Sequence, residues 1–308
     1  MQEEGVNVVF VSNHDYPFGM ASSKRIRLFA ENLPTTWKKS VVITGKSNGR
    51  NNEAGQYNAV SFGLVKFSTA SYLFNLFRVY RVLRAHKEKG RKNILFLYSN
   101  IRVTNFWFAL IGRILSYRIV TDIVEDQSAI DQKLSLVKTC KDEISIWLQG
   151  FLNKIVDGAV VISTRLREKH ENIDSVVLIT ISAENLLIST KKLVKEHNPV
   201  RFVYSGTFRA KDGIEELINA FVNEVKSEEG ELWFSGMAPE NLVKIIEPIP
   251  NIQFKGLIPD DEYYQYLQSS DVLLMTRTNS TYANTGFPFK LGEFLATAAS
   301  FEHLADND

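Results

Sequence analysis

Short apolar runs alternate with amphipathic segments along most of the chain, and this alternation limits the folds that it can adopt. The first run, 6–11, is followed at 21–33 by apolar residues at helical spacing, which end before Pro34. The pattern predicts further strands at 40–44, 93–98, 117–122 and 158–163, and helices at about 70–88, 102–115 and 142–155. Repetition of strand and helix in this way predicts a parallel sheet with helices on both faces.

The same alternation begins again after a polar segment at 191–198, where Pro199 precedes a new apolar run. Strands are expected in this half at 201–205, 231–235, 252–255 and 271–276. A length of 308 residues exceeds what one ordinary core accommodates. We therefore predict two α/β domains, 1–198 and 199–308, and a loop in the Gly-, Asn- and Ser-rich segment 45–57.

Charge is divided unevenly between the two predicted domains. Residues 1–197 hold 28 Lys and Arg against 18 Asp and Glu, whereas residues 198–308 hold 8 against 17, within a net charge of +1. This asymmetry suggests different partners for the two halves, and an anionic membrane or a phosphorylated acceptor suits the basic half. The chain has neither aromatic-interleaved basic motifs nor zinc-like Cys and His spacings, so nucleic acid is not expected as a partner.

The predicted helix at 70–88 is both apolar and basic. Its apolar positions are Leu73, Phe74, Leu76, Phe77, Tyr80 and Leu83, and its basic positions are Arg78, Arg81, Arg84 and Lys87. A helix of this kind can lie on an anionic bilayer. It can also pack on its own sheet with the cations facing water, and the sequence leaves both arrangements open.

A cytoplasmic location is predicted from what the sequence lacks. The single cysteine, Cys140, excludes an internal disulfide framework and fits a reducing compartment. The N-terminal residues lack the charged and apolar regions of a signal peptide. The longest apolar run, 106–111, is far shorter than the roughly 18 residues of a membrane span. Peripheral contact with the inner face of a membrane remains compatible with these features.

The segment 204–213 (Tyr-Ser-Gly-Thr-Phe-Arg-Ala-Lys-Asp-Gly) joins a predicted strand to a predicted helix. Gly206 ends the strand, and the helix is expected to begin near Gly213. Backbone N–H groups at a helix start are unsatisfied and attract anions. Arg209 and Lys211 add positive charge, which suits a diphosphate that must be stabilised as it departs. An ordinary turn with two solvated cations would give the same pattern.

The segment 284–293 (Asn-Thr-Gly-Phe-Pro-Phe-Lys-Leu-Gly-Glu) is a second such junction. Gly286 and Pro288 shape a turn, and Pro288 can occupy the first turn of a helix. Lys290 is a further candidate partner for phosphate, and Glu293 could accept two hydrogen bonds from a ribose diol. The alternative is an ordinary helix start with a partly buried Glu293.

Together the two segments resemble the C-terminal nucleotide-sugar domain of family 4 retaining glycosyltransferases, and the resemblance extends through 232–236, 251–256, 271–275 and 286–296. It implies the GT-B fold, in which two Rossmann-like α/β domains face each other across a cleft. It also implies that Lys211 binds donor phosphate, that Glu293 binds ribose, and that Gly256 and Leu257 meet the base. Gly206 and Lys290 join them as donor-binding candidates.

The first half resembles the family more weakly. Tyr16-Pro-Phe-Gly19, followed by Ala21, Ser22 and Arg25, is similar to the N-terminal loop that approaches the donor or acceptor. Glycine at position 19 would avoid a Cβ clash there. The segment 157–163 is similar to the last strand of the family's first domain. The alternative for the loop is a simple turn into a helix with a solvated Arg25.

Two departures from the family concern the donor. Many relatives have arginine where this chain has Thr207, so Arg209 must substitute or that contact is lost. Many also have glutamate where this chain has Thr285, which leaves Asn284 and the backbone of Gly286 and Phe287 for the donor sugar.

A third departure concerns the acceptor, because many relatives carry a histidine in the middle of the first domain. This chain offers Asp122, Glu125 and Asp126 after a predicted strand, while His14 and His86 are expected to lie elsewhere. Glu125 and Asp126 are therefore candidate catalytic residues on the acceptor side, beside Arg209 and Lys211 on the donor side. A solvated acidic loop is the alternative.

The end of the chain, 296–308, shows neither the Gly-Pro turn nor the Val/Ile strand that normally continues the second sheet. This suggests that the second domain is incomplete and that the chain is a truncated or frame-shifted product. Low stability and weak or absent activity would follow.

The sequence predicts a glycosyltransferase of polysaccharide biosynthesis. It would move a hexose-type sugar from a nucleoside diphosphate sugar to a glycan or lipid-linked acceptor, and the resemblance implies retention of configuration. No metal or further cofactor is expected, because cations and helix dipoles can stabilise the diphosphate. The alternatives are an inactive remnant and a nucleotide-sugar epimerase. A dinucleotide oxidoreductase ranks last, since no Gly-x-Gly-x-x-Gly follows any strand.

Overall fold

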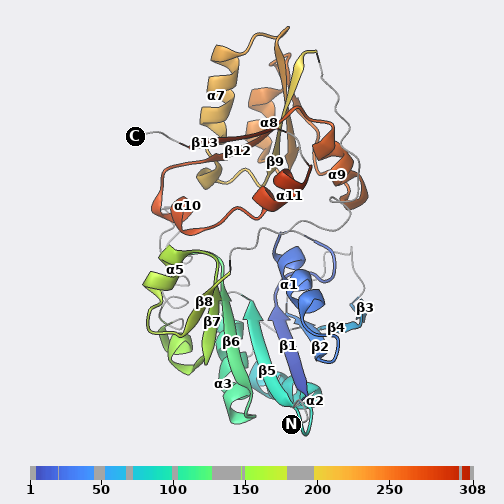
Figure 1. The fold of residues 1–308 in the computed structure, drawn as a ribbon, viewed down its shortest axis with the longest axis vertical. Helices are drawn as coiled ribbons and strands as arrows, with labels where there is room; N and C mark the ends of the chain where they lie inside the picture. The colour runs from blue at the N-terminus through green and yellow to red at the C-terminus, as the bar shows by residue number, and fades with distance from the viewer. Residues whose placement is uncertain are drawn as a thin grey trace. The chain divides into compact units, whose positions relative to one another are not determined.

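The computed structural model describes residues 5–19, 21–44, 53–66, 72–98, 103–126, 147, 150–178, 198–297 and 300–305. The chain divides into two compact units, each built around its own sheet (Figure 1). The first unit comprises Met1–Ile179 and Thr285–Phe287, and the second comprises Thr180–Asn284 and Pro288–Asp308.

The first unit holds an eight-stranded sheet in the order β3-β4-β2-β1-β5-β6-β7-β8. Its strands are β1 (Val6–Ser12), β2 (Lys38–Ile43), β3 (Ala54–Tyr57), β4 (Val60–Leu64), β5 (Lys92–Tyr98), β6 (Arg118–Ile123), β7 (Gly158–Val161) and β8 (Ser175–Val177). Its helices include α1 (Ala21–Asn32), α2 (Tyr72–His86), α3 (Val103–Ile114) and α5 (Thr164–Lys169). All neighbouring strands pair in parallel except β3 and β4, which form an antiparallel hairpin.

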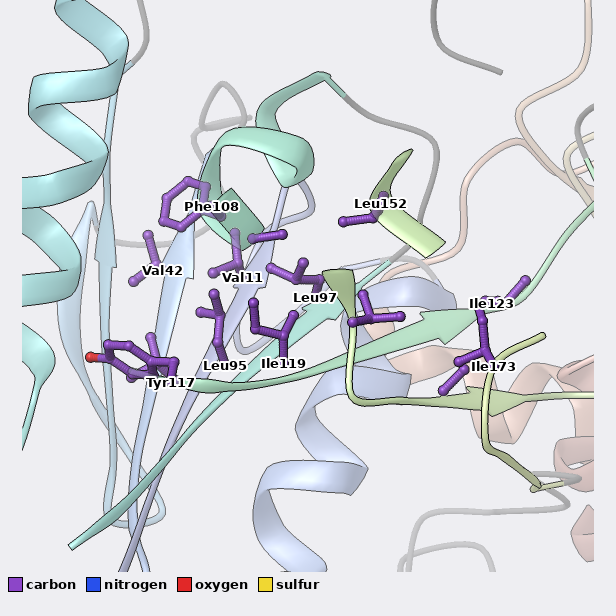
Figure 2. Packing of buried hydrophobic residues seen from close by; sticks show 14 of the residues in the cluster. Val11, Val42, Leu95, Leu97, Phe108, Tyr117, Ile119, Ile123, Leu152 and Ile173 are labelled. Carbon is purple, nitrogen blue, oxygen red and sulfur yellow. The ribbon is translucent and has the colours of Figure 1, made fainter. Parts of the chain in front are cut away.

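Helices cover both faces of this sheet. Successive residues of β1 point to opposite faces, and each set packs against different helices. Val9 and Val11 pack in a core cluster that includes residues of α2 and α3, whereas Val8 and Phe10 pack in one that includes Ile26 of α1. Figure 2 shows the first cluster, in which Val11, Leu95 and Leu97 lie beneath Phe108 of α3. The predicted doubly covered parallel sheet is confirmed.

The second unit holds a five-stranded parallel sheet in the order β11-β10-β9-β12-β13. Its strands are β9 (Val200–Gly206), β10 (Gly230–Gly236), β11 (Ile252–Phe254), β12 (Val272–Arg277) and β13 (Ser300–Ala305). The helices among its described residues are η2 (Ala210–Asp212), α7 (Ile214–Glu224), α8 (Glu240–Ile246), α9 (Asp260–Gln268), α10 (Thr281–Thr285) and α11 (Lys290–Thr297). Core residues of α7 and α8 share one cluster, and Leu267 of α9 and Phe294 of α11 share another.

Both sheets are doubly wound. In the first, β1 lies between β2 and β5, and in the second, β9 lies between β10 and β12. The chain therefore builds each sheet first to one side of its opening strand and then to the other. Ligands of open α/β sheets bind beyond the carboxyl ends of the strands at such a switch point. The switch points lie at β1/β5 and at β9/β12.

Two expectations from the sequence are wrong in this part of the structure. Residues 54–57 form strand β3 rather than a loop, because Asn58 and Ala59 adopt positive φ angles of 45° and 62° and close a two-residue hairpin. Residues 300–305 form β13, which pairs along β12 from Val272↔Ser300 to Arg277↔Ala305. Main-chain pairing makes this strand although its composition lacks the expected Val and Ile.

Several sequence predictions fall partly or wholly outside the described residues. These are residues 45–52 of the predicted loop, half of the predicted helix at 142–155, and Cys140. Residues 150–155 of that helix are helical. β8 and α5 were not predicted. Among the described residues, no helix is both long enough and apolar enough to cross a membrane.

The carboxyl ends of β10 and β9 approach each other so closely that only glycine fits. A Cβ added to Gly236, whose φ is +124°, would lie 1.9 Å from the carbonyl oxygen of Gly206. Gly256 also has a positive φ, +68°, but a Cβ there would meet no atom within 4 Å. A side chain at Gly256 would therefore introduce backbone strain alone, whereas a side chain at Gly236 would also overlap with Gly206.

We expect Gly236→Ala to lower the free energy of unfolding much more than Gly256→Ala. The Gly256→Ala variant adds only the strain of a left-handed residue, about 1–2 kcal/mol. Gly236→Ala must also push two strands apart. Urea unfolding of both variants measures the difference, and equal losses would contradict the close approach of Gly206 and Gly236.

Candidate active site

The turn after β9 is fixed to the end of β12 at the switch point of the second sheet. The hydroxyl of Thr276 donates a hydrogen bond to the carbonyl of Asp212, and the backbone N–H of Thr278 donates to the carbonyl of Lys211 over 3.0 Å. Gly213, with φ at +57°, then lets the turn enter α7. These bonds place Lys211 between the two strands of the switch point.

Lys290, the first residue of α11, reaches the end of β9. Its ammonium group donates a hydrogen bond to the carbonyl of Ser205 and lies 5.0 Å from the centre of the Tyr204 ring. The pKa of Lys290 is lowered to about 8, mainly by burial and in smaller part by the nearby charges of Lys211 and Arg277. Asp212 and Glu293 favour its charged form but do not offset the burial.

Lys211 and Arg277 therefore both lie close enough to Lys290 to repel its ammonium group. Like charges gathered at one place stabilise a folded chain only when an anion or an acidic side chain offsets them. Asp212 provides part of this compensation. The remaining positive potential, at the carboxyl ends of parallel strands, suits a phosphate-bearing ligand.

Asp212 is a central residue of this site that the sequence analysis did not select. Its Oδ2 accepts a hydrogen bond of 3.0 Å from the backbone N–H of Arg209. Burial raises the pKa of Tyr204, and the charge of Asp212 and a hydrogen bond to its carboxylate raise it further. The position of Asp212, three residues after Arg209 in a turn, was the available signal, because a carboxylate there commonly caps the turn.

Gly206 makes room for this arrangement. A Cβ at position 206 would lie 2.6 Å from the hydroxyl of Tyr204 and 2.7 Å from the Nζ of Lys290. The sequence analysis assigned Gly206 to the donor. The structure shows that the same glycine also allows two side chains to close over the end of β9.

Glu293 lies on the inner side of α11 and is only 5% exposed. The hydroxyl of Tyr263 on α9 lies 3.4 Å from its Oε2 in a hydrogen bond. Burial raises the pKa of Tyr263, and the negative charge of Glu293 raises it further. Glu293, which the sequence predicts to bind ribose, thus lies close to Lys290 of the cation cluster. Its carboxylate already accepts a hydrogen bond from Tyr263. Pro288 precedes α11 and does not occupy its first turn.

The remaining donor candidates are spread more widely. Gly256 and the exposed Leu257 follow β11 at the same edge of the second sheet, and Arg209 is exposed at the start of η2. Asn284 is exposed, and its amide donates to Asn279 over 2.8 Å.

Gly286 and Phe287 belong to the first unit by their contacts. The hydroxyl of Ser163 donates to the carbonyl of Thr285 over 2.8 Å, and Phe287 packs against the core of the first unit. The structure therefore assigns these two candidates and Lys290 to different units.

Arg25 and Asp122 form a buried ion pair near the carboxyl edge of the first sheet. The Nε and one terminal nitrogen of Arg25 lie 2.7 and 2.8 Å from the two carboxylate oxygens of Asp122. Both side chains are buried, so the alternative of a solvated Arg25 is wrong. Burial raises the pKa of Asp122, although the hydrogen bonds and charge of Arg25 oppose the shift.

His14 lies at the β1/β5 switch point, and the expectation that it lies elsewhere is wrong. Its ring packs edge-on against Tyr98 with centroids 5.5 Å apart. Burial raises the pKa of Tyr98, and the charges of Asp122 and Glu125 raise it further, so both carboxylates face this neighbourhood. The register of β1 with β5, Val11↔Leu97, brings together residues more than 80 positions apart in the sequence.

The other first-unit candidates have structural partners. Asp126 is buried, and both of its carboxylate oxygens accept hydrogen bonds of 2.6 Å from Lys169 of α5. His86 ends α2, away from the switch point, with its ring nitrogen 2.9 Å from the carbonyl of Val82. A Cβ at Gly19, whose φ is +153°, would lie 2.5 Å from the hydroxyl of Ser23, so α1 itself requires a glycine there.

The chain was compared with known proteins. No family model matches it. No curated protein sequence matches it either. Among the described residues, no three His, Cys, Asp or Glu side chains gather in a group that could hold a metal ion.

Solved structures match nearly the whole chain. Anabaena HepE in complex with UDP matches with a TM-score of 0.65 at 11% sequence identity, covering 96% of this chain and 80% of that one. The apo form of the lipopolysaccharide outer core galactosyltransferase WaaB matches with 0.56 at 16%, covering 97% and 80%. A putative UDP-N-acetylglucosamine 2-epimerase from Listeria monocytogenes matches with 0.57 at 14%, covering 98% and 80%.

These similarities, together with the two doubly wound sheets, establish the fold. The chain consists of two Rossmann-like α/β domains of the GT-B class, as predicted from the sequence. At these identities the similarity concerns the fold, and the chemistry has to be argued from the residues at the two switch points.

The Arg25–Asp122 pair generates a stability prediction. Asp122→Asn leaves the buried guanidinium without its counter-charge, and the loss of one partner of a buried pair costs about 3–5 kcal/mol. Asp157 provides a matched control, because its carboxylate bonds the more exposed Arg113 and Arg118. We expect Asp157→Asn to cost about 1 kcal/mol or less in urea unfolding. Equal losses in the two variants would contradict a buried pair.

Lys290 generates a pH prediction. Its pKa is about 8 in the folded chain against an ordinary 10.5, so between these values the unfolded chain binds a proton that the folded chain has released. The contribution of Lys290 to the free energy of unfolding therefore rises with pH over this interval. We expect the difference in stability between the wild type and Lys290→Met to grow in favour of the wild type from about pH 7.5 to about pH 9.5. Parallel pH profiles of the two proteins would contradict the burial of this ammonium group.

Proposed function

We propose that the chain is a glycosyltransferase whose second unit binds the diphosphate of a nucleoside diphosphate sugar at the β9/β12 switch point. The observation that carries the proposal is the cluster of Lys211, Arg277 and Lys290 at that edge. The solved structure of Anabaena HepE in complex with UDP shares the fold and supports a nucleotide ligand for this class.

Transfer requires the bond between the anomeric carbon and the diphosphate oxygen to break, and its electron pair passes to the diphosphate. Positive charge that is already in place lowers the barrier, because no solvent or side chain has to reorganise during the step. We assign this task to Lys211, with Arg209 as an exposed second cation that can reach a bound diphosphate. Lys290 supplies charge from behind the turn while it is bonded to Ser205.

We assign the acceptor to the first unit. The acceptor hydroxyl must lose its proton as it bonds to the anomeric carbon, and a group at the β1/β5 edge would assist it. His14 and Glu125 are the candidates there, because both lie near Tyr98. Asp126, predicted as a second acceptor-side residue, is less suited while Lys169 holds both of its oxygens.

The finer features of the proposal come from the sequence resemblance. They are a hexose-type donor sugar, retention of configuration, a glycan or lipid-linked acceptor in polysaccharide biosynthesis, and ribose binding by Glu293. The match to the apo galactosyltransferase WaaB supports a sugar-transfer reaction for this fold. A lipid-linked acceptor would also bring the enzyme into peripheral contact with a membrane.

A nucleotide-sugar epimerase is the second candidate, because a putative enzyme of that kind also matches the fold. The two reactions differ in what they need. An epimerase converts its nucleotide sugar without an acceptor, whereas a transferase releases nucleoside diphosphate in proportion to the acceptor that is glycosylated. Incubation of nucleotide sugars with and without glycan acceptors, followed by chromatography of the products, distinguishes them.

Nucleotide binding gives the direct test of the donor site. We expect uridine, guanosine or adenosine diphosphate to raise the melting temperature of the wild type, because a ligand that binds only the folded chain stabilises it. Lys211→Ala should weaken that affinity by about tenfold or more, the usual loss for a charge-assisted hydrogen bond. Thermal shift over a concentration series of each nucleotide measures both effects.

Lys226→Ala is the matched control, because Lys226 is an exposed lysine of the same unit that pairs only weakly with Glu229 at 3.7 Å. Its nucleotide affinity should equal that of the wild type. A Lys211→Ala variant that binds every nucleotide as tightly as the control would remove Lys211 from the site.

A further inference from the structure

The outward face of α2 and the turn that follows it carry a dense group of exposed cations. On α2, the exposed positions Phe77, Arg81 and Arg84 follow one another at helical spacing, with Arg78 beside them, while Val79 and Leu83 face the core. The turn to β5 adds Lys87, Lys89 and Lys92, all of them exposed. We refer to the six cations Arg78, Arg81, Arg84, Lys87, Lys89 and Lys92 as the basic surface.

Few acidic groups balance this charge. From residue 54 to residue 121 the sequence holds 11 Lys and Arg and one acid, Glu88. Glu88 is bonded to Lys38 over 2.5 Å. Lys87, Lys89 and Lys92 line a surface hollow with Arg118, which shares the carboxylate of Asp157 with Arg113. Among the described residues, therefore, the cations of the basic surface outnumber the acids beside them.

Exposed apolar side chains lie in the same layer of helices. Phe77 of α2 is 63% exposed and Ile114 of α3 is 66% exposed. Residues 150–155 belong to this layer, because Leu152 shares the core cluster of α2 and α3 and the carbonyl of Ile155 accepts a hydrogen bond of 2.7 Å from Arg113.

An aromatic pair, Trp147 and Phe151, lies at the start of this segment. Trp147 is 64% exposed, and its ring lies 4.6 Å from that of the exposed Phe151. Lys154 lies over the Phe151 ring at 5.7 Å. Exposed aromatic rings next to cations are typical of segments that sit at the boundary between lipid headgroups and acyl chains.

We propose that the outer face of α2 and α3, together with Trp147 and residues 150–155, binds the surface of an anionic lipid bilayer. The cations of the basic surface would contact lipid phosphates, and Phe77, Ile114 and Trp147 would enter the headgroup region. Charge complementarity favours this partner, because the first half of the chain is strongly basic although the whole chain has a net charge of only +1.

The basic surface is separate from the candidate active site. The hollow lies at the amino ends of β5 and β6, which begin at Lys92 and Arg118, whereas His14 and Asp122 lie at the carboxyl ends of their strands. Lipid binding and sugar transfer therefore depend on different residues and can be tested separately.

Vesicle sedimentation tests the proposal. The full chain is mixed with neutral phosphatidylcholine vesicles or with vesicles that also contain phosphatidylglycerol, and the bound fraction is measured without any nucleotide. We expect binding only to the anionic vesicles, and weaker binding as salt is raised. Arg81→Gln with Arg84→Gln should lower the partition coefficient by about 25-fold, since each cation near such a surface contributes about fivefold. Trp147→Ser should lower it with no change in charge.

The control is the double variant Lys226→Gln with Lys244→Gln, which removes the same charge from exposed positions of the second unit. It should bind the vesicles as the wild type does. Both double variants should keep the nucleotide thermal shift of the wild type, so a failure of lipid binding would leave the proposed transfer reaction intact. The proposal is overturned by equal binding to neutral vesicles, by equal loss in the two double variants, or by a preference for duplex DNA over vesicles at the same salt.

Discussion

The ammonium group of Lys290 connects three parts of the second unit, and the geometry of the candidate donor site depends on it. It holds the start of α11 against the carbonyl of Ser205 at the end of β9, lies against Tyr204, and faces the carboxylate of Asp212 in the turn. Asp212 in turn fixes the backbone of Arg209. A buried ammonium is tolerated only when acceptors and counter-charges surround it, so the turn that carries Lys211 is positioned by the same contacts that offset this burial.

The first unit uses a buried charge pair in a comparable place. Arg25 joins α1 to β6 through both oxygens of Asp122, at the edge where Tyr98 and His14 lie. In both units these polar residues gather at the switch point of the parallel sheet, β1/β5 in the first unit and β9/β12 in the second. The fold therefore creates two separate chemical environments from the same βαβ construction, one with a cluster of cations and one with buried carboxylates in ion pairs.

Much of the fold could be predicted from the sequence, because parallel strands and their covering helices have strong periodic patterns. The exceptions lacked such patterns. The β3–β4 hairpin turns through Asn58-Ala59 rather than a glycine-containing pair, and β13 is defined by main-chain pairing rather than by Val or Ile. Lys211 and Lys290 were selected as donor-site candidates from their motifs. The position of His14 could not be predicted, since strand register decides it. The spacing of Asp212 from Arg209 was a sequence signal for a capped turn, but the hydrogen bond itself is seen only in the structure.

Glycine ends β9 and β10, at positions 206 and 236, and a third glycine, 256, follows β11; the N–H of Gly236 donates to the carbonyl of Gly256 over 2.8 Å. Consequently the rim of the sheet at these three positions is main chain without side chains, and its amides and carbonyls are bonded to one another. A nucleobase resting on it would meet a flat backbone surface. Discrimination between bases would then fall to the few residues that project past the rim, among them the exposed Met237 after β10 and the exposed Leu257 after β11.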